Sequence, residues 1–520
     1  MKLLFVLFYP GHLRYFDSSL RLLAEAGHTV YLIFDNREKQ KEGLETLNAL
    51  PENIIVLNKY LKRADAWKPI AAGLRILVDY INYLDPQYID SHYLRDRWKD
   101  YLERTSPKLH FVAKIRTLPR FLVKFFIRVL LTLEKAIPPS EKIQSHLSEI
   151  APDLVLVTSM VMKASPQTDV VKTARAMGLK VGYCVSSWDN LTTKGLIRVQ
   201  PDRVIVWNEI QKVEAQTIHD VPPAKIICTG AHPFDRWFSR QPSITHEAFC
   251  QKVGLPADKP FVLFLGSTAG ISAHDDEQKF VRQWIKAIRE SHLPSIQDLG
   301  ILIRPHPYNS GNWKNVDLSD LNNVALWPKE GANPVNESDR SDYFDSLYHC
   351  VAVVGINTSA MLEAAIVGRS VHTILASDFQ NTQSGTLHFR YLLPENGGFV
   401  KVAATLDEHL QQLCESLNNP EETQETIRQF VQSFIRPHGL DRPAGSVFVE
   451  AIETLAKAAP EPPRKMSPLL YPLSLLLLLA GPYILCTPEK ASESWRRSRD
   501  KLVEGLSGFK QKLKSLRGTG

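Results

Sequence analysis

Cysteine is scarce in this sequence, and none of its six residues is paired in a Cys-x-x-Cys motif. The cysteines are scattered over the chain, at positions 184, 228, 250, 350, 414 and 486. This pattern argues against a zinc site and against a disulfide framework, and it suits a reducing cytosol. The run His274-Asp275-Asp276-Glu277 resembles a metal site only superficially, because acidic residues before a helix are common caps. No metal is expected.

An excess of charge is lacking from most of the chain. The net charge is +6, and residues 490–520 carry nine Lys or Arg against three acidic residues, which accounts for all of it. The remaining residues are formally neutral. A nucleic-acid-binding body is therefore excluded on electrostatic grounds.

A cleavable signal peptide is also lacking. The apolar start, residues 1–8, ends at Tyr9-Pro10-Gly11, and no small-residue cleavage site follows. A first buried strand is the better interpretation. The length of 520 residues is too great for one core, so we expect two domains with additional segments.

Short apolar segments alternate with helical ones along the chain. Strands are predicted at 3–8, 29–34, 54–57, 154–157, 180–184, 203–206 and 225–228, with a first helix over 17–26. A second unit has predicted strands at 261–265, 301–304, 324–327, 351–354 and 371–374, closed by helices near 406–417, 423–433 and 444–457. Strands joined by helices form mostly parallel sheets. The sequence therefore predicts an α/β protein with two Rossmann-like domains, residues 1–230 and 231–458, facing each other across a cleft.

One segment of the first domain breaks this alternation. Residues 107–133 hold six Lys or Arg, no acidic residue and many aromatic and aliphatic side chains, and a basic amphipathic insertion near 107–135 is predicted. Such a helix is typical of proteins that lie on an anionic membrane surface. The alternative is an ordinary domain helix with solvated lysines.

A second apolar segment follows a proline-rich linker within residues 459–520. Residues 469–486 carry no charge, but Pro472 and Pro482 interrupt them. Their length is at the short limit for a spanning helix, so an interfacial or re-entrant hairpin is favoured over a simple span. The alternative is a buried core helix. The basic tail that ends the chain also suits an anionic membrane.

Phosphate-binding chemistry is predicted where strands of the second unit end. Arg304 and His306 end the strand in the run Arg304-Pro305-His306-Pro307, and Thr358 and Ser359 begin a helix after the strand at 351–354. An Arg fork, an imidazole and a helix N-terminus with hydroxyl groups together favour a diphosphate. The small-residue turn Gly266-Ser267-Thr268 follows the strand at 261–265 and supports the same site.

Two strand ends of the first unit carry candidate acceptor-binding groups. His12 and Arg14 follow the first strand, and Trp188, Asp189 and Asn190 follow the strand at 180–184. Either the imidazole of His12 or the carboxylate of Asp189 is suited to general base catalysis, and the sequence does not choose between them. Arg14 is suited to an acceptor phosphate, and Trp188 to stacking on a sugar.

This layout resembles the GT-B glycosyltransferases, over roughly residues 1–458. The motifs of the second half are most similar to those of CDP-glycerol glycerophosphotransferases and bacterial surface-polysaccharide transferases, and also to UDP-N-acetylglucosamine 2-epimerase. The resemblance implies an acceptor in the first domain and a nucleotide-activated donor in the second. It also implies that His12, in a Gly-His turn, is the base and that Glu363 binds the ribose. Gln383 and His388, in the polar loop 378–390, are predicted to contact the transferred sugar.

The resulting expectation is a metal-independent glycosyltransferase without a bound cofactor, whose co-substrate is a nucleotide-sugar. Its acceptor would be a lipid-linked or cell-envelope glycan, and its place the cytoplasmic face of a bacterial inner membrane, as a monotopic or peripheral protein. The alternatives are a CDP-activated polyol-phosphate transferase, a sugar-nucleotide epimerase and a non-catalytic membrane scaffold that binds a glycan.

Overall fold

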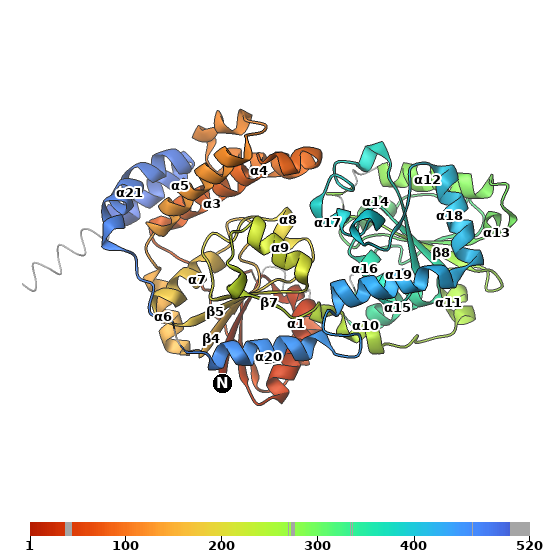
Figure 1. Cartoon of the computed structure of the whole chain (residues 1–520), viewed down its shortest axis with the longest axis horizontal. Coiled ribbons are helices and arrows are strands. Elements are labelled where there is room, and N and C mark those ends of the chain that lie inside the picture. The colour runs from red at the N-terminus through yellow and green to blue at the C-terminus, as the bar shows by residue number, and fades with distance from the viewer. Residues whose placement is uncertain are drawn as a thin grey trace, which may run out of the picture.

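The structure is a computed structural model that describes residues 1–36, 44–268, 270–271, 276–332, 334, 336–459 and 461–499. It has two lobes, each built on a parallel sheet (Figure 1). The predicted basic tail beyond residue 499, and His274 and Asp275 of the acidic run, lie outside the described residues.

The first lobe holds a sheet of seven strands in the order β3-β2-β1-β4-β5-β6-β7. The strands are β1 (Lys2–Leu7), β2 (Thr29–Phe34), β3 (Ile54–Val56), β4 (Leu154–Val157), β5 (Lys180–Cys184), β6 (Arg203–Val206) and β7 (Ile226–Cys228). All neighbouring strands among them pair in parallel, as predicted. The central strands are almost wholly apolar and buried on both faces, as a sheet covered on both sides requires.

The second lobe holds six parallel strands in the order β10-β9-β8-β11-β12-β13. They are β8 (Phe261–Leu265), β9 (Gly300–Arg304), β10 (Val324–Leu326), β11 (Ala352–Gly355), β12 (Ser370–Ile374) and β13 (Lys401–Ala403). The last of these, β13, was not predicted from the sequence. In both lobes the carboxyl ends of the central strands carry the loops that form the candidate site.

The helices of the first lobe are α1 (Leu13–Glu25), α2 (Leu44–Asn48), α6 (Glu141–Ile150), α7 (Gln167–Ala176), α8 (Asn190–Thr193) and α9 (Glu209–Thr217). The link and second lobe contain α10 (Asp235–Ser239), α11 (His246–Val253), α12 (Asp276–Arg289), α13 (Pro294–Gln297), α14 (Ser310–Trp313), α15 (Glu337–His349), α16 (Ala360–Ile366), α17 (Leu387–Arg390), α18 (Leu406–Asn418) and α19 (Gln424–Phe430). Helix α1 begins four residues before the predicted Asp17, directly after the short 3-10 turn Pro10–His12.

Helix α20 (Ala444–Lys457) crosses back to the first lobe, although the sequence placed it in the second domain. Its buried Phe448 and Ile452 pack in one cluster with Leu3 and Phe16 under the first sheet. The carboxylate of Asp235, in the link between the lobes, accepts hydrogen bonds from the first backbone N–H groups of α20. The apolar stripe of α20 therefore fills a gap in the first core, and the boundary predicted at residue 458 does not separate the domains.

The predicted insertion is a helical unit beside the first lobe. It contains α3 (Trp67–Asn82), α4 (His92–Thr105) and α5 (Arg120–Lys135). The basic segment from residue 107 begins with two 3-10 turns, so its helix starts only at Arg120. The predicted apolar segment forms one continuous helix, α21 (Tyr471–Leu485), which includes Pro482 and packs against α3 (Figure 1).

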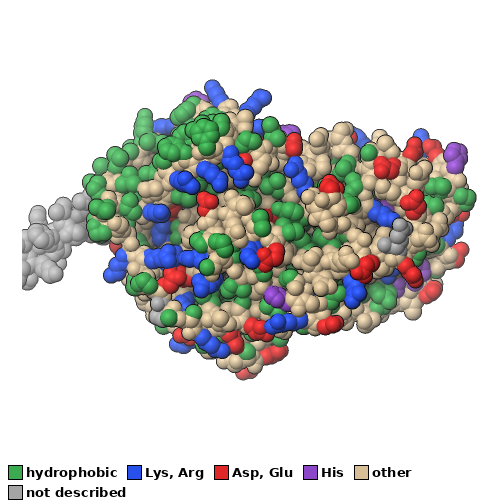
Figure 2. All heavy atoms as spheres, in the orientation of Figure 1, with side chains coloured by type: hydrophobic (Ala, Val, Ile, Leu, Met, Phe, Trp, Pro, Cys, Tyr) green, Lys and Arg blue, Asp and Glu red, His purple; other side chains and the backbone are tan. Residues whose placement is uncertain are grey.

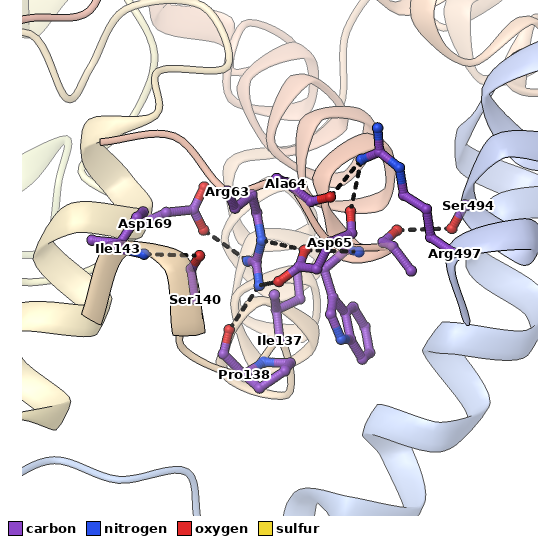
Figure 3. Close-up of polar contacts among 12 residues, drawn as sticks. Arg63, Ala64, Asp65, Ile137, Pro138, Ser140, Ile143, Asp169, Ser494 and Arg497 are labelled. Carbon is purple, nitrogen blue, oxygen red and sulfur yellow. Dashed lines mark hydrogen bonds and ion pairs between the residues drawn. The ribbon is translucent and has the colours of Figure 1, made fainter. Parts of the chain in front are cut away.

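Residues 63–66, which lead into α3, are tied to the first lobe by a buried ion pair and to the C-terminal segment by a hydrogen bond (Figure 3). The guanidinium of Arg63 donates to Asp65, to Asp169 Oδ1 at 2.8 Å and to the carbonyl of Pro138. In the helical residues 488–499, Ser494 Oγ donates to the Ala66 carbonyl oxygen at 2.8 Å. Removing one partner of such a buried ion pair costs about 3–5 kcal/mol, so the unit is a fixed part of the fold.

Candidate active site

The candidate site is a cleft whose walls come from both lobes. The first lobe contributes Arg14, Tyr15, Ser187 and Trp188, and the second lobe Gly266, Arg304, Pro305, His306, Tyr308, Thr358, Ser359 and Glu363. These residues follow β1 and β5 on one side and β8, β9 and β11 on the other. The phenol oxygens of Tyr9 and Tyr308 lie 3.2 Å apart and join the two sides.

Arg304 is the last residue of β9, and its guanidinium is buried at the wall of the cleft. Its Nη1 donates to Asp342 Oδ2 at 2.9 Å and to Ser346 Oγ at 2.8 Å. Its Nη2 is buried and has no hydrogen-bond partner among the described residues. A buried guanidinium nitrogen without an acceptor is costly, so this nitrogen is suited to an oxygen of a ligand.

His306 lies two residues beyond Arg304, between two prolines. Its Nδ1 accepts a hydrogen bond from the backbone N–H of Tyr308 at 3.1 Å. Burial, and to a smaller extent the charge of Arg14, lower the pKa of His306 to about 4. The neutral imidazole therefore carries its proton on Nε2 and is suited to donate a hydrogen bond rather than to supply a charge.

Gly266 follows β8 at the place where the loop after β9 comes closest. A Cβ atom at this position would lie 2.8 Å from the His306 backbone nitrogen and 3.2 Å from the Arg304 carbonyl oxygen. The glycine thus allows the close approach of residues 304–306, whereas the sequence predicted that it would let the backbone approach a diphosphate. This close contact between the two loops fixes the positions of Arg304 and His306.

Thr358, Ser359 and Glu363 line the same cleft from the loop and short helix after β11. The Tyr343 hydroxyl donates a hydrogen bond to Glu363 Oε2. Burial raises the pKa of Glu363 to about 7. Six of the residues predicted for the second domain line this one cleft: Gly266, Arg304, His306, Thr358, Ser359 and Glu363. Their roles in donor binding stay predictions.

Comparison with known proteins gives the fold but no family. No family model matches the chain, and the comparison with curated proteins found no match. Among solved structures, UDP-GlcNAc 2-epimerase from Methanocaldococcus jannaschii has a TM-score of 0.50 at 14% identity, covering 87% of this chain and 100% of the other. The chain has the GT-B fold.

Two further solved structures match along nearly their whole length. UDP-GlcNAc 2-epimerase from Neisseria meningitidis gives a TM-score of 0.49 at 13% identity and covers 87% of this chain and 100% of its own. A glycosyltransferase from Rickettsia africae gives 0.47 at 12% identity, covering 88% of this chain and 99% of its own.

Four predicted donor residues lie outside the GT-B cleft wall. Ser267 is fully buried, and its Oγ lies 3.5 Å from the Asn357 backbone nitrogen; Thr268 is half-buried on the same turn. The Gln383 side chain is fully buried and donates to the Ile356 carbonyl at 2.9 Å, which ties its loop to the sheet. His388 is buried behind Trp188, with the two rings 4.8 Å apart. The predicted contact of Ser267 and Thr268 with the diphosphate stays a prediction. So does the predicted contact of Gln383 and His388 with the transferred sugar.

On the acceptor side, the GT-B cleft includes Arg14 and Trp188 but not the two predicted bases. His12 is buried among Phe8, Tyr9 and Tyr15, and burial lowers its pKa to about 3. Its role as a base therefore stays a prediction that this geometry does not favour.

Asp189 and Asn190 lie directly behind the cleft wall. The Asp189 carboxylate accepts from Ser187 Oγ at 2.6 Å and from Thr193 Oγ1 at 2.8 Å. Burial would raise the pKa of Asp189, but Lys194, His388 and these hydroxyl groups hold it below its usual range. A carboxylate with such a low pKa is a weak general base. Asn190 is buried and accepts from Ser186.

The sequence missed three further arginines of the GT-B cleft: Arg236, Arg240 and Arg340. Arg236 and Arg240 lie in and just after α10, in the link after β7, and Arg340 lies on α15. Burial, and to a smaller extent the charge of Arg340, lower the pKa of Arg236 to about 10. Arg236 could have been predicted, because it lies in the link that follows the carboxyl end of β7. Nothing in the sequence marks Arg340.

Within the described residues, no group of three or more His, Cys, Asp or Glu is placed to hold a metal ion.

Proposed function

We propose that the protein is a glycosyltransferase that moves a sugar from a nucleoside-diphosphate donor to an acceptor hydroxyl group. The observation that carries this proposal is the unpaired Nη2 of Arg304, buried beside His306 and Thr358 at the meeting point of two parallel sheets. Guanidinium, imidazole and hydroxyl donors on one wall are suited to the oxygens of a departing diphosphate.

The charge balance of the cleft supports an anionic ligand. Five arginines line it, and Glu363 is the one Asp or Glu among the described lining residues. Arg340 Nη2 is, like Arg304 Nη2, buried without a hydrogen-bond partner among the described residues. Cations held near one another in a partly buried site favour a ligand with at least two negative charges.

Each group then has a role in transfer. The second lobe holds the donor diphosphate, and the Nε2–H of His306 donates to the oxygen on which negative charge develops as the sugar leaves. The first lobe presents the acceptor along Trp188 and Arg14. Glu363 has a pKa of about 7, which suits proton removal at neutral pH, whereas the pKa values of His12 and Asp189 lie far below. Glu363 lines the donor side of the cleft, where the resemblance assigns it to the ribose, so it is a base candidate only in place of that contact.

The rival functions differ in what they release. An epimerase, the activity named for the structure from M. jannaschii, converts its substrate without an acceptor. A polyol-phosphate transferase releases a nucleoside monophosphate. A non-catalytic scaffold releases nothing.

The test incubates the protein with UDP-, GDP- and CDP-sugars and with a CDP-activated polyol, with and without a bacterial lipid extract, and identifies the nucleotide products by chromatography. We expect nucleoside diphosphate release that requires the extract and that falls at least about tenfold in Arg304→Ala. Release of a monophosphate, isomerisation of the donor without extract, or no turnover of any donor would each refute the transferase.

A further inference from the structure

Two helices from distant parts of the sequence expose one apolar surface. On α5, the side chains of Phe121, Phe125 and Val129 are 71%, 57% and 46% exposed. On α21, Leu475, Leu479 and Tyr483 are 59%, 62% and 59% exposed. The two helices contact each other, and Figure 2 shows hydrophobic side chains gathered over this end of the molecule. We call these six side chains the apolar face.

The apolar face follows from helical spacing. Phe121, Phe125 and Val129 recur every four residues, as do Leu475, Leu479 and Tyr483, so each set forms a stripe along its helix. Both helices also bury apolar side chains on the opposite side, such as Val123 on α5. A surface helix of a soluble protein normally turns polar groups outward, so an exposed apolar stripe on each of two adjacent helices marks an interaction site.

Helix α21 is attached to the protein and does not have the length of a span. The 18 residues 468–485 are apolar enough and numerous enough to be a candidate span, with a mean hydropathy of 1.8. The α-helix within them, α21, has only 15 residues. At 1.5 Å per residue it is about 22 Å long, shorter than the roughly 30 Å hydrocarbon core of a bilayer.

The contacts of α21 also favour a helix that lies on a membrane. A Cβ atom on Gly73 of α3 would lie 2.2 Å from the Leu485 carbonyl oxygen, so the two helices pack closely. Ser106 Oγ donates to the same carbonyl at 2.6 Å, which caps the end of α21. One side of α21 is thus fixed against α3, and only its other side is available to lipid.

The positive charge around the apolar face indicates which partner binds there. The segment 107–133 carries six cations and no acidic residue, and the ammonium of its Lys108 lies 2.9 Å from the ring centre of Tyr483. Residues 501–520 carry five Lys or Arg and one acidic residue, so this tail has the same sign of charge as the surroundings of the face. The tail and a second copy of the chain are both repelled, whereas a bilayer with anionic headgroups is attracted.

We propose that α5 and α21 together dock the protein on an anionic lipid bilayer, with the apolar face inserted among the headgroups and no segment crossing. Resting on the proposed function, this docking restricts the acceptor to a molecule presented at a membrane surface, a lipid-linked one.

The test is flotation of the full-length protein with vesicles of phosphatidylglycerol and phosphatidylcholine in equal parts, and with vesicles of phosphatidylcholine alone. We expect binding to the anionic vesicles that weakens at high salt. The double variant Phe125→Asp/Leu479→Asp should lower vesicle binding by about tenfold or more, because it places charge where apolar groups enter the headgroup layer. Val213→Asp is the matched control: Val213 is 54% exposed on α9, outside the apolar face, and its variant should bind as the wild type does.

Three results would overturn the proposal. The double variant could bind vesicles as well as the wild type does. The wild type could be a dimer that the double variant separates, which would make a second copy the occupant. The wild type could fail to bind while a chain ending at residue 499 binds, which would make the tail the occupant. Nucleoside diphosphate affinity without vesicles, measured in parallel, tests the cleft separately.

Discussion

At the scale of single residues, the cleft is defined by polar groups that the protein leaves without partners. Arg304 Nη2 and Arg340 Nη2 are buried and have no acceptor among the described residues. Most buried polar groups in proteins are paired, so two such nitrogens at one cleft are informative. These two nitrogens indicate where the oxygens of a ligand bind. The predicted bases give a weaker indication of the site.

A buried carboxyl group behind the cleft gives a test of the structure itself. Glu214 on α9 is 3% exposed, and burial raises its pKa to about 8 from 4.5. The folded state therefore holds a proton between about pH 4.5 and 8 that the unfolded state has lost. Because the folded state binds more protons in this window, the free energy of unfolding falls as the pH rises through it.

Replacing the carboxyl group of Glu214 should remove this loss of stability at high pH. We expect Glu214→Gln to match the wild type near pH 5 and to exceed its stability by up to about 5 kcal/mol at pH 9, in thermal or urea unfolding. Glu209→Gln is the control on the same helix, because the Glu209 side chain is 71% exposed. An equal effect of the two variants at pH 9 would show that Glu214 is not buried.

At the scale of elements, the approach of two strand ends shapes the diphosphate wall. We expect Gly266→Ala to weaken nucleoside diphosphate binding about tenfold, because its Cβ would displace the backbone that carries Arg304 and His306. Gly270→Ala is the matched control in the same loop, since its Cβ would meet nothing closer than 3.9 Å. Calorimetric titration measures both variants, and unchanged binding in Gly266→Ala would contradict this geometry.

Strands were predictable from the sequence to within one or two residues, because short apolar runs between helical segments have few other interpretations. The strand at 29–34 was predicted with the bounds that β2 has. By contrast, β13 (Lys401–Ala403) begins with a lysine that interrupts the apolar run, so its pattern did not indicate a strand. The equally short β3 and β10 consist of apolar residues only. Helix α20 was recognised, but its partner was not, because an apolar stripe does not say which sheet it covers.

The candidate site was predictable only in part, for a related reason. Arg304, His306 and Thr358 follow strands, and parallel strands bring their carboxyl ends to one edge of the sheet. Arg340 lies on a helix with no motif and reaches the cleft through tertiary packing. Whether Ser267 and Gln383 face the cleft or the core depends on side-chain direction after the strand, which the sequence does not encode locally.

At the scale of the whole molecule, the site exists only because two lobes are held together. Asp235 in the link accepts from Arg436 Nη2 at 2.8 Å and from the first N–H groups of α20, so both crossings between the lobes meet at one carboxylate. Arg14 of the first lobe and Arg304 of the second then line one cleft. Ligand affinity is therefore a property of the assembled pair.

The central claim is that this cleft binds a nucleoside diphosphate through Arg304. The most direct measurement is calorimetric titration of the wild type, Arg304→Lys and Arg304→Ala with UDP, GDP, CDP and ADP. We predict that at least one of these binds the wild type and that its Kd rises about 10- to 100-fold in Arg304→Ala, and by less in Arg304→Lys, which keeps the charge but loses the fork. Arg304→Ala loses the ion pair with Asp342 and should unfold at a lower temperature, but it should remain folded at the temperature of the titration, because Asp342 keeps Lys252 and Trp327 as partners. Equal affinity in all three proteins, or no binding of any diphosphate, would contradict the account.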